Sequence, residues 1–216
     1  MITTTIARKA SMALSGLFLI LFLGQHFTIN LISVFSEKFF NLLSHFMGNN
    51  PLVQFILQPV LIFGVVFHFL MGFVLELKNS KSRSVKYVSF NGSSNASWVS
   101  RNMIISGIVV LSFLGLHFYD FWVPEMNYKY VQFLPQDPDR YYGELVHKFH
   151  SPLRVVIYVL SFVFLSLHLL HGFASSFQSV GLNNKYTHGI KWFTKAFSLV
   201  IPAGFIFIAI FHHLNG

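Results

Sequence analysis

The chain has 216 residues, of which 54% are hydrophobic and 10% are charged, and 27 of them are phenylalanine. Soluble domains have about 45–50% apolar and about 25% charged residues, so this composition argues against a soluble protein and predicts one embedded in a lipid bilayer. The sequence has no cysteine, which excludes disulfides, thiolate metal sites, cysteine-ligated iron–sulfur clusters and cysteine nucleophiles within this chain. The net charge of +8 arises in loops between apolar spans and forms no basic groove, which argues against nucleic acid binding.

Apolar stretches long enough to cross a bilayer, which needs about 20 residues, occur five times. They predict an all-α membrane protein with one transmembrane domain, residues 1–216, and spans at residues 10–34, 52–77, 102–123, 152–177 and 192–211. The first stretch resembles a secretory signal. However, no small-residue cleavage pattern closes it, and His26 and Asn30 interrupt its later half, so we expect a mature helix.

The polar intervals between the spans are predicted to be loops, and the interval 124–151 has room for a short surface helix. Five spans place the two termini on opposite sides of the membrane. The N-terminal tail and the second and fourth loops, with their flanks, carry ten basic residues and one acid, Glu76. This excess of positive charge predicts that the N-terminus is cytoplasmic. No internal repeat along the chain is strong enough to use.

Four histidines lie in the first four spans, one in each: His26, His68, His117 and His168. Spans one and three run outward, and their histidines lie roughly 24 Å past the start of the helix, near the outer face. Spans two and four run inward, which puts the other two histidines near the inner face. Depth therefore pairs His26 with His117 and His68 with His168, but it does not separate His168 from His171, one turn away.

Paired imidazoles at one level of a helix bundle match the two axial positions of haem iron. Zinc or copper would require three or four nitrogen or sulfur ligands together. A lone histidine could simply hydrogen-bond a neighbouring helix, whereas four that pair by depth favour a functional role. Composition and spacing therefore predict a two-haem membrane cytochrome, with the haems between the first four helices.

The chain resembles a known family along nearly its whole length. The matching residues are Met12-Ala-Leu-Ser-Gly-Leu-Phe-Leu19 followed by His26 and Asn30, His68-x-x-x-Gly72, His117, and His168-Leu-Leu-His-Gly172-Phe-Ala-Ser-Ser-Phe-Gln-Ser179. They resemble the five-helix, dihaem cytochrome b subunit of succinate:quinone oxidoreductases, especially the form found in Bacteroidetes. The resemblance implies that His68 and His168 bind the inner haem and that His26 and His117 bind the outer haem. The four-residue spacing from histidine to glycine favours His168 over His171.

The resemblance also implies the rest of an enzyme complex. This chain would anchor a flavoprotein subunit carrying FAD and an iron–sulfur subunit on the cytoplasmic side of a bacterial inner membrane. Succinate would be oxidised on the flavoprotein, and electrons would pass through the inner and then the outer haem b to menaquinone, or in reverse during fumarate reduction. No catalytic residue for succinate would lie in this chain. Ser166 occupies a position where some members carry a glutamate linked to proton movement, so we assign no such pathway.

Further candidates follow from the predicted side of the membrane alone. The quinone candidates on the outer side are Asn30, Glu37, Tyr141, Tyr142, His147 and His150. The candidates for binding haem propionates are Arg8, Lys9 and Arg101 inside and Arg154 outside. Two other functions stay open: a haem b subunit of another dehydrogenase, such as a hydrogenase or formate dehydrogenase, and a haem-free transporter with a histidine-lined path.

Overall fold

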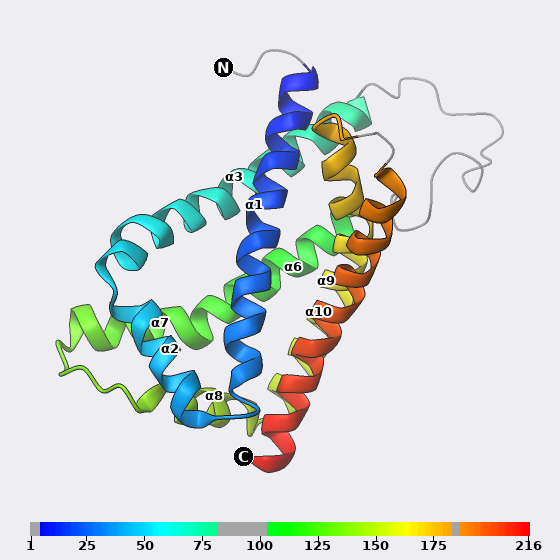
Figure 1. Cartoon of the computed structure of the whole chain (residues 1–216). Helices are drawn as coiled ribbons and strands as arrows, with labels where there is room; N and C mark the ends of the chain where they lie inside the picture. The colour runs from blue at the N-terminus through cyan, green and yellow to red at the C-terminus, as the bar shows by residue number, and fades with distance from the viewer. Residues whose placement is uncertain (1–4, 82–102, 183–185) are drawn as a thin grey trace.

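The computed structural model describes residues 5–81, 103–182 and 186–216 (Figure 1). These residues form helices and connecting turns, with no strand among them. Five of the described helical segments are long and apolar enough to cross a membrane, which confirms the predicted number of spans. The described part of the chain is therefore all-helical, with the spans expected of a multi-pass membrane protein.

The spanning helices lie close to the predicted ranges. They are α1 (Thr5–Ile32), α3 (Gln58–Lys81) preceded by the π-helical turn η1 (Val53–Leu57), α6 (Met103–His117), α9 (Pro152–Ser179) and α10 (Thr187–Asn215). The third span continues beyond α6 through η2 (Phe118–Trp122), α7 (Val123–Met126) and η3 (Asn127–Val131). The fifth begins five residues before the expected start at Trp192.

The third span passes Pro124, where the sequence predicted its end. The helix widens first into the π-helical turn η2, in which the Val123 N–H bonds the carbonyl of Phe118. Pro124 then lies in the first turn of α7. The helical path continues without a break from η2 into α7, so the proline does not end the span.

Two amphipathic helices lie at the end of the bundle opposite the start of α1: α2 (Glu37–Asn49) and α8 (Arg140–Phe149). A short helix in the interval of α8 was expected, but the prediction of a loop over α2 was wrong. The Ser36 hydroxyl caps α2 by accepting a hydrogen bond from the Phe39 N–H at 3.3 Å. The turn-forming residues Gly48 and Asn49 lie in the last turn of α2, and Asn50 is its C-cap.

The bundle has two ends, which we name from the orientation predicted by the loop charges. The inner end is where α1 begins, at the top of Figure 1, and the outer end is where α10 finishes, beside α2 and α8. Helix α1 packs against α3 and α9, and α6 packs against α9 and α3. These four helices thus form a ring of neighbours in which α1 and α6, and α3 and α9, are diagonal partners. Helix α10 packs outside the ring against α9 and α1.

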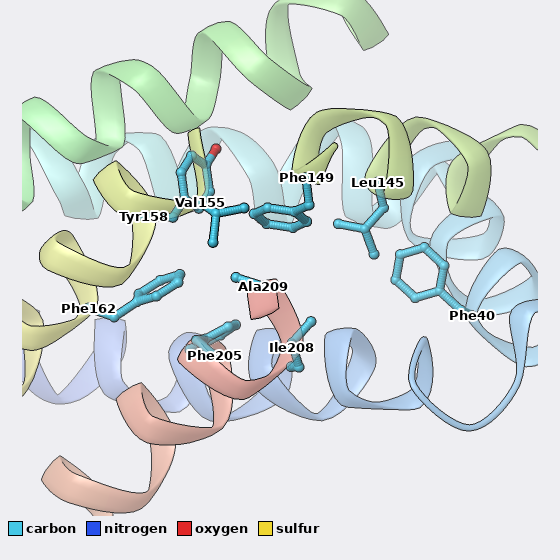
Figure 2. Packing of buried hydrophobic residues seen from close by; sticks show 9 residues of the cluster. All are labelled: Phe40, Leu145, Phe149, Val155, Tyr158, Phe162, Phe205, Ile208 and Ala209. Carbon is cyan, nitrogen blue, oxygen red and sulfur yellow. The ribbon is translucent and has the colours of Figure 1, made fainter. Parts of the chain in front are cut away.

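The largest buried cluster lies in the outer half of the bundle. Figure 2 shows its side chains converging from α2, α8, α9 and α10: Phe40, Leu145, Phe149, Val155, Tyr158, Phe162, Phe205, Ile208 and Ala209. Elsewhere the apolar surface faces outward, and only 6% of the most apolar window of the second span is buried inside the protein. A surface this apolar fits contact with lipid rather than with water.

Candidate functional site

The structure brings together the two histidine pairs that depth predicted. The ring centroids of His26 on α1 and His117 on α6 lie 5.7 Å apart, and those of His68 on α3 and His168 on α9 lie 6.4 Å apart. Each pair joins diagonal helices and so crosses the centre of the four-helix ring. The ring that faces His68 belongs to His168 rather than to His171. Ligation of iron by these residues stays a prediction.

The separation within each pair suits a single metal ion between two rings. Histidine nitrogen binds metals at about 2 Å and lies about 1 Å from the ring centre, so two imidazoles on opposite sides of one ion have centroids about 6 Å apart. The rings meet at interplanar angles of 84° and 72°, so neither pair is held by parallel stacking. The spacing therefore fits two trans ligands at each level.

A serine on the neighbouring helix fixes the orientation of His68. The Ser15 Oγ on α1 lies 3.0 Å from the His68 Nδ1 and also donates to the Met12 carbonyl at 2.8 Å. A serine hydroxyl has one hydrogen, and the carbonyl takes it. The hydroxyl can then only accept from the imidazole, so Nδ1 carries the hydrogen and Nε2 keeps a free lone pair. A lone pair at Nε2 is what a metal ligand requires.

His168 has the same arrangement on the other side of the inner pair. The Ser106 Oγ on α6 lies 3.3 Å from the His168 Nδ1 and donates to the Met103 carbonyl at 2.8 Å. The His168 ring also hydrogen-bonds the Met103 carbonyl, so this carbonyl and the Ser106 hydroxyl are both its partners. Neither serine was among the residues singled out from the sequence.

The two serines belong to an internal repeat that the sequence analysis missed. Residues Met12–His26 and Met103–His117 both read Met-x2-Ser-Gly-x5-Phe-x3-His, and residues His68–Phe73 and His168–Phe173 both read His-x-Leu-x-Gly-Phe. Each half of the four-helix ring therefore contributes one helix of each kind, α1 with α3 and α6 with α9. The intervening segments differ in length and sequence, which hid the repeat.

The repeat also bears on the choice between the histidines of α9. A Cβ on Gly72 would lie 3.6 Å from the Met12 side chain, and a Cβ on Gly172 would lie 3.1 Å from the Met103 side chain, so the halves pack alike. In this correspondence His168 matches His68, whereas His171 matches Met71. Both the geometry and the repeat thus place His168 in the pair.

The outer pair lies among aromatic rings rather than serines. Phe22 stacks on His26 at 5.4 Å, and Phe113, its counterpart in the repeat, lies 5.8 Å from the His117 ring. The Asn30 amide nitrogen is 3.4 Å from both ring nitrogens of His26 and donates to the carbonyl of that residue at 2.8 Å.

The Nδ1 of His117 is buried and has no hydrogen-bond partner among the described residues. Buried polar atoms without partners are rare in folded proteins. This ring therefore fits a site that is completed by a group other than the chain itself.

A buried carboxylate lies one helical turn beyond His117. Asp120 is 1% exposed, accepts a hydrogen bond from the Tyr158 hydroxyl at 2.8 Å, and lies 3.3 Å from the Arg154 guanidinium. The Tyr158 ring lies 6.4 Å from that of His117. Arg154, predicted as a propionate ligand, thus pairs with Asp120. The sequence signal that we passed over was an acid inside an apolar span.

Asp120 also contributes to a hollow of about 450 Å³ at the outer end. The other lining residues come from α7 and α8: Pro124, Arg140, Gly143, Glu144, His147 and Lys148. Among the six predicted quinone-site residues, His147 lines this hollow, and the His150 ring lies 6.2 Å from that of His147.

Arg140 holds the wall of the hollow together. Its guanidinium pairs with Glu125 and with Glu144, the latter at 2.5 Å, and it lies over the rings of Tyr128 and Tyr141 at 4.1 and 4.5 Å. Burial lowers the pKa of Arg140, but the hydrogen bonds and charges of the two glutamates outweigh it, so the net pKa lies above the ordinary value. Burial, together with the charge of Glu125, also raises the pKa of Tyr141.

The remaining quinone candidates are dispersed. The Tyr141 hydroxyl accepts from the Asn49 amide at 3.4 Å and so joins α8 to α2. The Tyr142 ring packs edge-on against His212 at 5.6 Å and so joins α8 to α10. Glu37 is exposed at the start of α2, and Asn30 contacts His26. The structure does not gather the six residues into one site.

The inner candidates for propionate binding lie at the start of α1. Arg8 is half-buried and Lys9 is exposed, whereas Arg101 lies outside the described residues. Contact of Arg8 and Lys9 with a propionate stays a prediction.

Comparisons with protein-family models, with curated proteins and with solved structures found no match to this chain. The functional argument therefore rests on the geometry of the site.

Proposed function

We propose that this chain is a dihaem cytochrome b that anchors a succinate:menaquinone oxidoreductase in a bacterial inner membrane. The observation that carries the proposal is the presence of two diagonal histidine pairs, with ring centroids 5.7 and 6.4 Å apart. In the inner pair, the Ser15 and Ser106 hydroxyls lie 3.0 and 3.3 Å from the two Nδ1 atoms, an arrangement that favours hydrogen on Nδ1 and a lone pair on each Nε2. The family resemblance supports the choice of succinate as the electron source.

The residues present fit two bis-histidine haems. His68 and His168 would hold the inner one, and His26 and His117 the outer one. When bound, a haem with both axial positions filled by histidine supplies one-electron transfer rather than oxygen chemistry. The serines fix the inner rings, and the phenylalanines beside the outer rings exclude water from that level.

The partners follow from what this chain lacks and from the resemblance. Without cysteine, this chain cannot ligate an ordinary iron–sulfur cluster, so that relay would belong to a partner, as would FAD and the succinate site. The basic loops of the inner side would face these soluble subunits. The same arrangement would serve fumarate reduction with the electron flow reversed.

The hollow at the outer end offers polar side chains to a quinone head group. Quinone carbonyls need hydrogen-bond donors, and Arg140, His147 and Lys148 line the hollow together with Asp120. Asp120 follows His117 by one helical turn, so the hollow adjoins the outer pair. We propose this hollow, rather than the dispersed tyrosines, as the menaquinone site.

The test is to purify the tagged chain from haem-replete bacterial membranes with its native partners. We expect b-type bands in the reduced-minus-oxidised spectrum and co-purification of a flavoprotein that oxidises succinate. A b-type spectrum with a partner that oxidises hydrogen or formate would replace the proposal with a different dehydrogenase. Folded protein without b-type bands would instead favour a haem-free transporter.

A further inference from the structure

The hydroxyls of Ser15 and Ser106 are hydrogen-bond partners of the inner histidines. The same repeated motif supplies both serines. In each half of the bundle the serine is followed by a glycine, and the glycine faces the same imidazole as the serine. A Cβ on Gly16 would lie 3.3 Å from the His68 ring, and one on Gly107 would lie 3.7 Å from the His168 ring. Each Ser-Gly step thus provides a hydrogen-bond acceptor and room for the ring.

We propose that Ser15 and Ser106 are positioning residues that set the tautomer and the donor strength of the two inner axial ligands. Each serine holds the hydrogen on Nδ1, as the bonds to the Met12 and Met103 carbonyls dictate. An acceptor at Nδ1–H makes the imidazole a stronger electron donor to a bound metal. Stronger donation stabilises ferric over ferrous iron, so the pair of serines lowers the reduction potential of the inner centre.

The outer pair lacks this device, which makes the effect specific to one level. His26 has the Asn30 amide nitrogen near its ring, which is a donor rather than an acceptor, and the Nδ1 of His117 has no partner among the described residues. Removing either serine should therefore change the inner centre alone. The effect of Ser106→Ala should be the smaller of the two, because His168 keeps the Met103 carbonyl as a hydrogen-bond partner.

The experiment measures the potentials of both haems by spectroelectrochemistry in the purified complex carrying Ser15→Ala, Ser106→Ala or both. A hydrogen bond contributes about 1 kcal/mol net, so Ser15→Ala should raise the ferrous-to-ferric ratio of the inner haem about fivefold at fixed potential. At 59 mV per tenfold for one electron, this is about 40 mV upward. Ser106→Ala should give a smaller upward shift, and the double variant the largest. The potential of the outer haem should not change.

Two serines on the same helices provide matched controls. Ser11 on α1 donates to the Ala7 carbonyl at 2.9 Å, and Ser112 on α6 donates to the Ile108 carbonyl at 3.0 Å, each within its own helix. Ser11→Ala and Ser112→Ala should leave both potentials unchanged. Ser15→Thr and Ser106→Thr keep the hydroxyl and should restore the inner potential.

The outcomes separate this inference from the proposed function on which it rests. A wild-type complex without two haems removes the proposed function. Two haems, with unchanged inner potentials in both alanine variants, overturn the inference alone. If the alanine variants lose only the inner haem and the threonine variants regain it, the inference is supported. Equal shifts in the potentials of both haems would contradict the inference.

Discussion

The inner and outer histidine pairs are built from the same repeat, yet different contacts fix them. The inner rings are held by serine hydroxyls at 3.0 and 3.3 Å, one from each half of the bundle. The outer rings are packed by phenylalanines, beside a buried carboxylate that occurs in one half only, since Ile29 stands in the repeat where the other half has Asp120. Both levels have a histidine pair, whereas the hollow that Asp120 helps to line lies at the outer level only.

The contacts that orient each inner histidine also differ from those that bring the two halves of the bundle together. Each serine bonds a histidine in its own half, whereas each histidine pair joins the two halves. A cofactor held between paired histidines would therefore link halves that each orient their own ligands. This division makes the two levels separable by mutation.

The largest expected effect comes from the histidines themselves. His68→Ala or His168→Ala should abolish the inner haem, and His26→Ala or His117→Ala the outer haem, because one imidazole cannot fill both axial positions. Haem content and redox difference spectra of each purified variant give the measurement. His171→Ala is the matched control and should keep both haems. If single variants that remain folded lose both haems to the same extent, the two levels are not independent.

The buried carboxylate of the outer level should carry the next largest effect. Asp120→Leu leaves the Tyr158 hydroxyl without its acceptor and Arg154 without its charge partner. We expect a loss of about 3 kcal/mol in unfolding free energy, at the low end for breaking a buried ion pair because Arg154 is 27% exposed. Thermal unfolding in detergent measures it, together with the spectrum of the outer haem.

Asp137→Asn, at an exposed acid that serves only the turn before α8, is the control for Asp120 and should be neutral. An Asp120→Leu variant as stable as this control would show that the buried pair does not hold the outer level. A perturbed inner haem with an intact outer one would contradict the placement of Asp120.

The smallest effect should distinguish the two halves at the inner level. An alanine at Gly16 would press on the His68 ring at 3.3 Å and on the Ser176 hydroxyl at 3.4 Å, whereas at Gly107 the nearest atom is 3.7 Å away in ordinary contact. Overpacking costs about 1–3 kcal/mol, so Gly16→Ala should lower the occupancy of the inner haem while Gly107→Ala is tolerated. Haem titration of the two variants measures the difference, and equal occupancies would show that the halves do not differ here.

The spans and the histidine pairs could be predicted from the sequence because each depends on a single property of it. Length and apolarity give a span, and position along a span gives depth, which was enough to pair His26 with His117 and His68 with His168. The course of the third span past Pro124 was not accessible, since it depends on a π-helical turn with no composition signal. Helix α2 could have been predicted from its Ser36 cap and the helical spacing of its phenylalanines.

The side-chain partners of the site needed the structure. Ser15 and Ser106 look like small residues that ease helix packing until their distances to the imidazoles are known. The choice of His168 over His171 needed both the geometry and the repeat, because one turn of a helix does not separate them by depth. The quinone candidates were chosen only by the side of the membrane on which they were predicted to lie. They are dispersed because the side gives the depth of a residue and not its position around the bundle.

The number of haems bound to each folded chain tests the central claim most directly. Pyridine haemochrome analysis of the purified complex, normalised to protein, should give two b-type haems per chain, and a redox titration should resolve two potentials. One haem or none in a folded, haem-replete preparation would contradict the assignment of both histidine pairs as axial ligands.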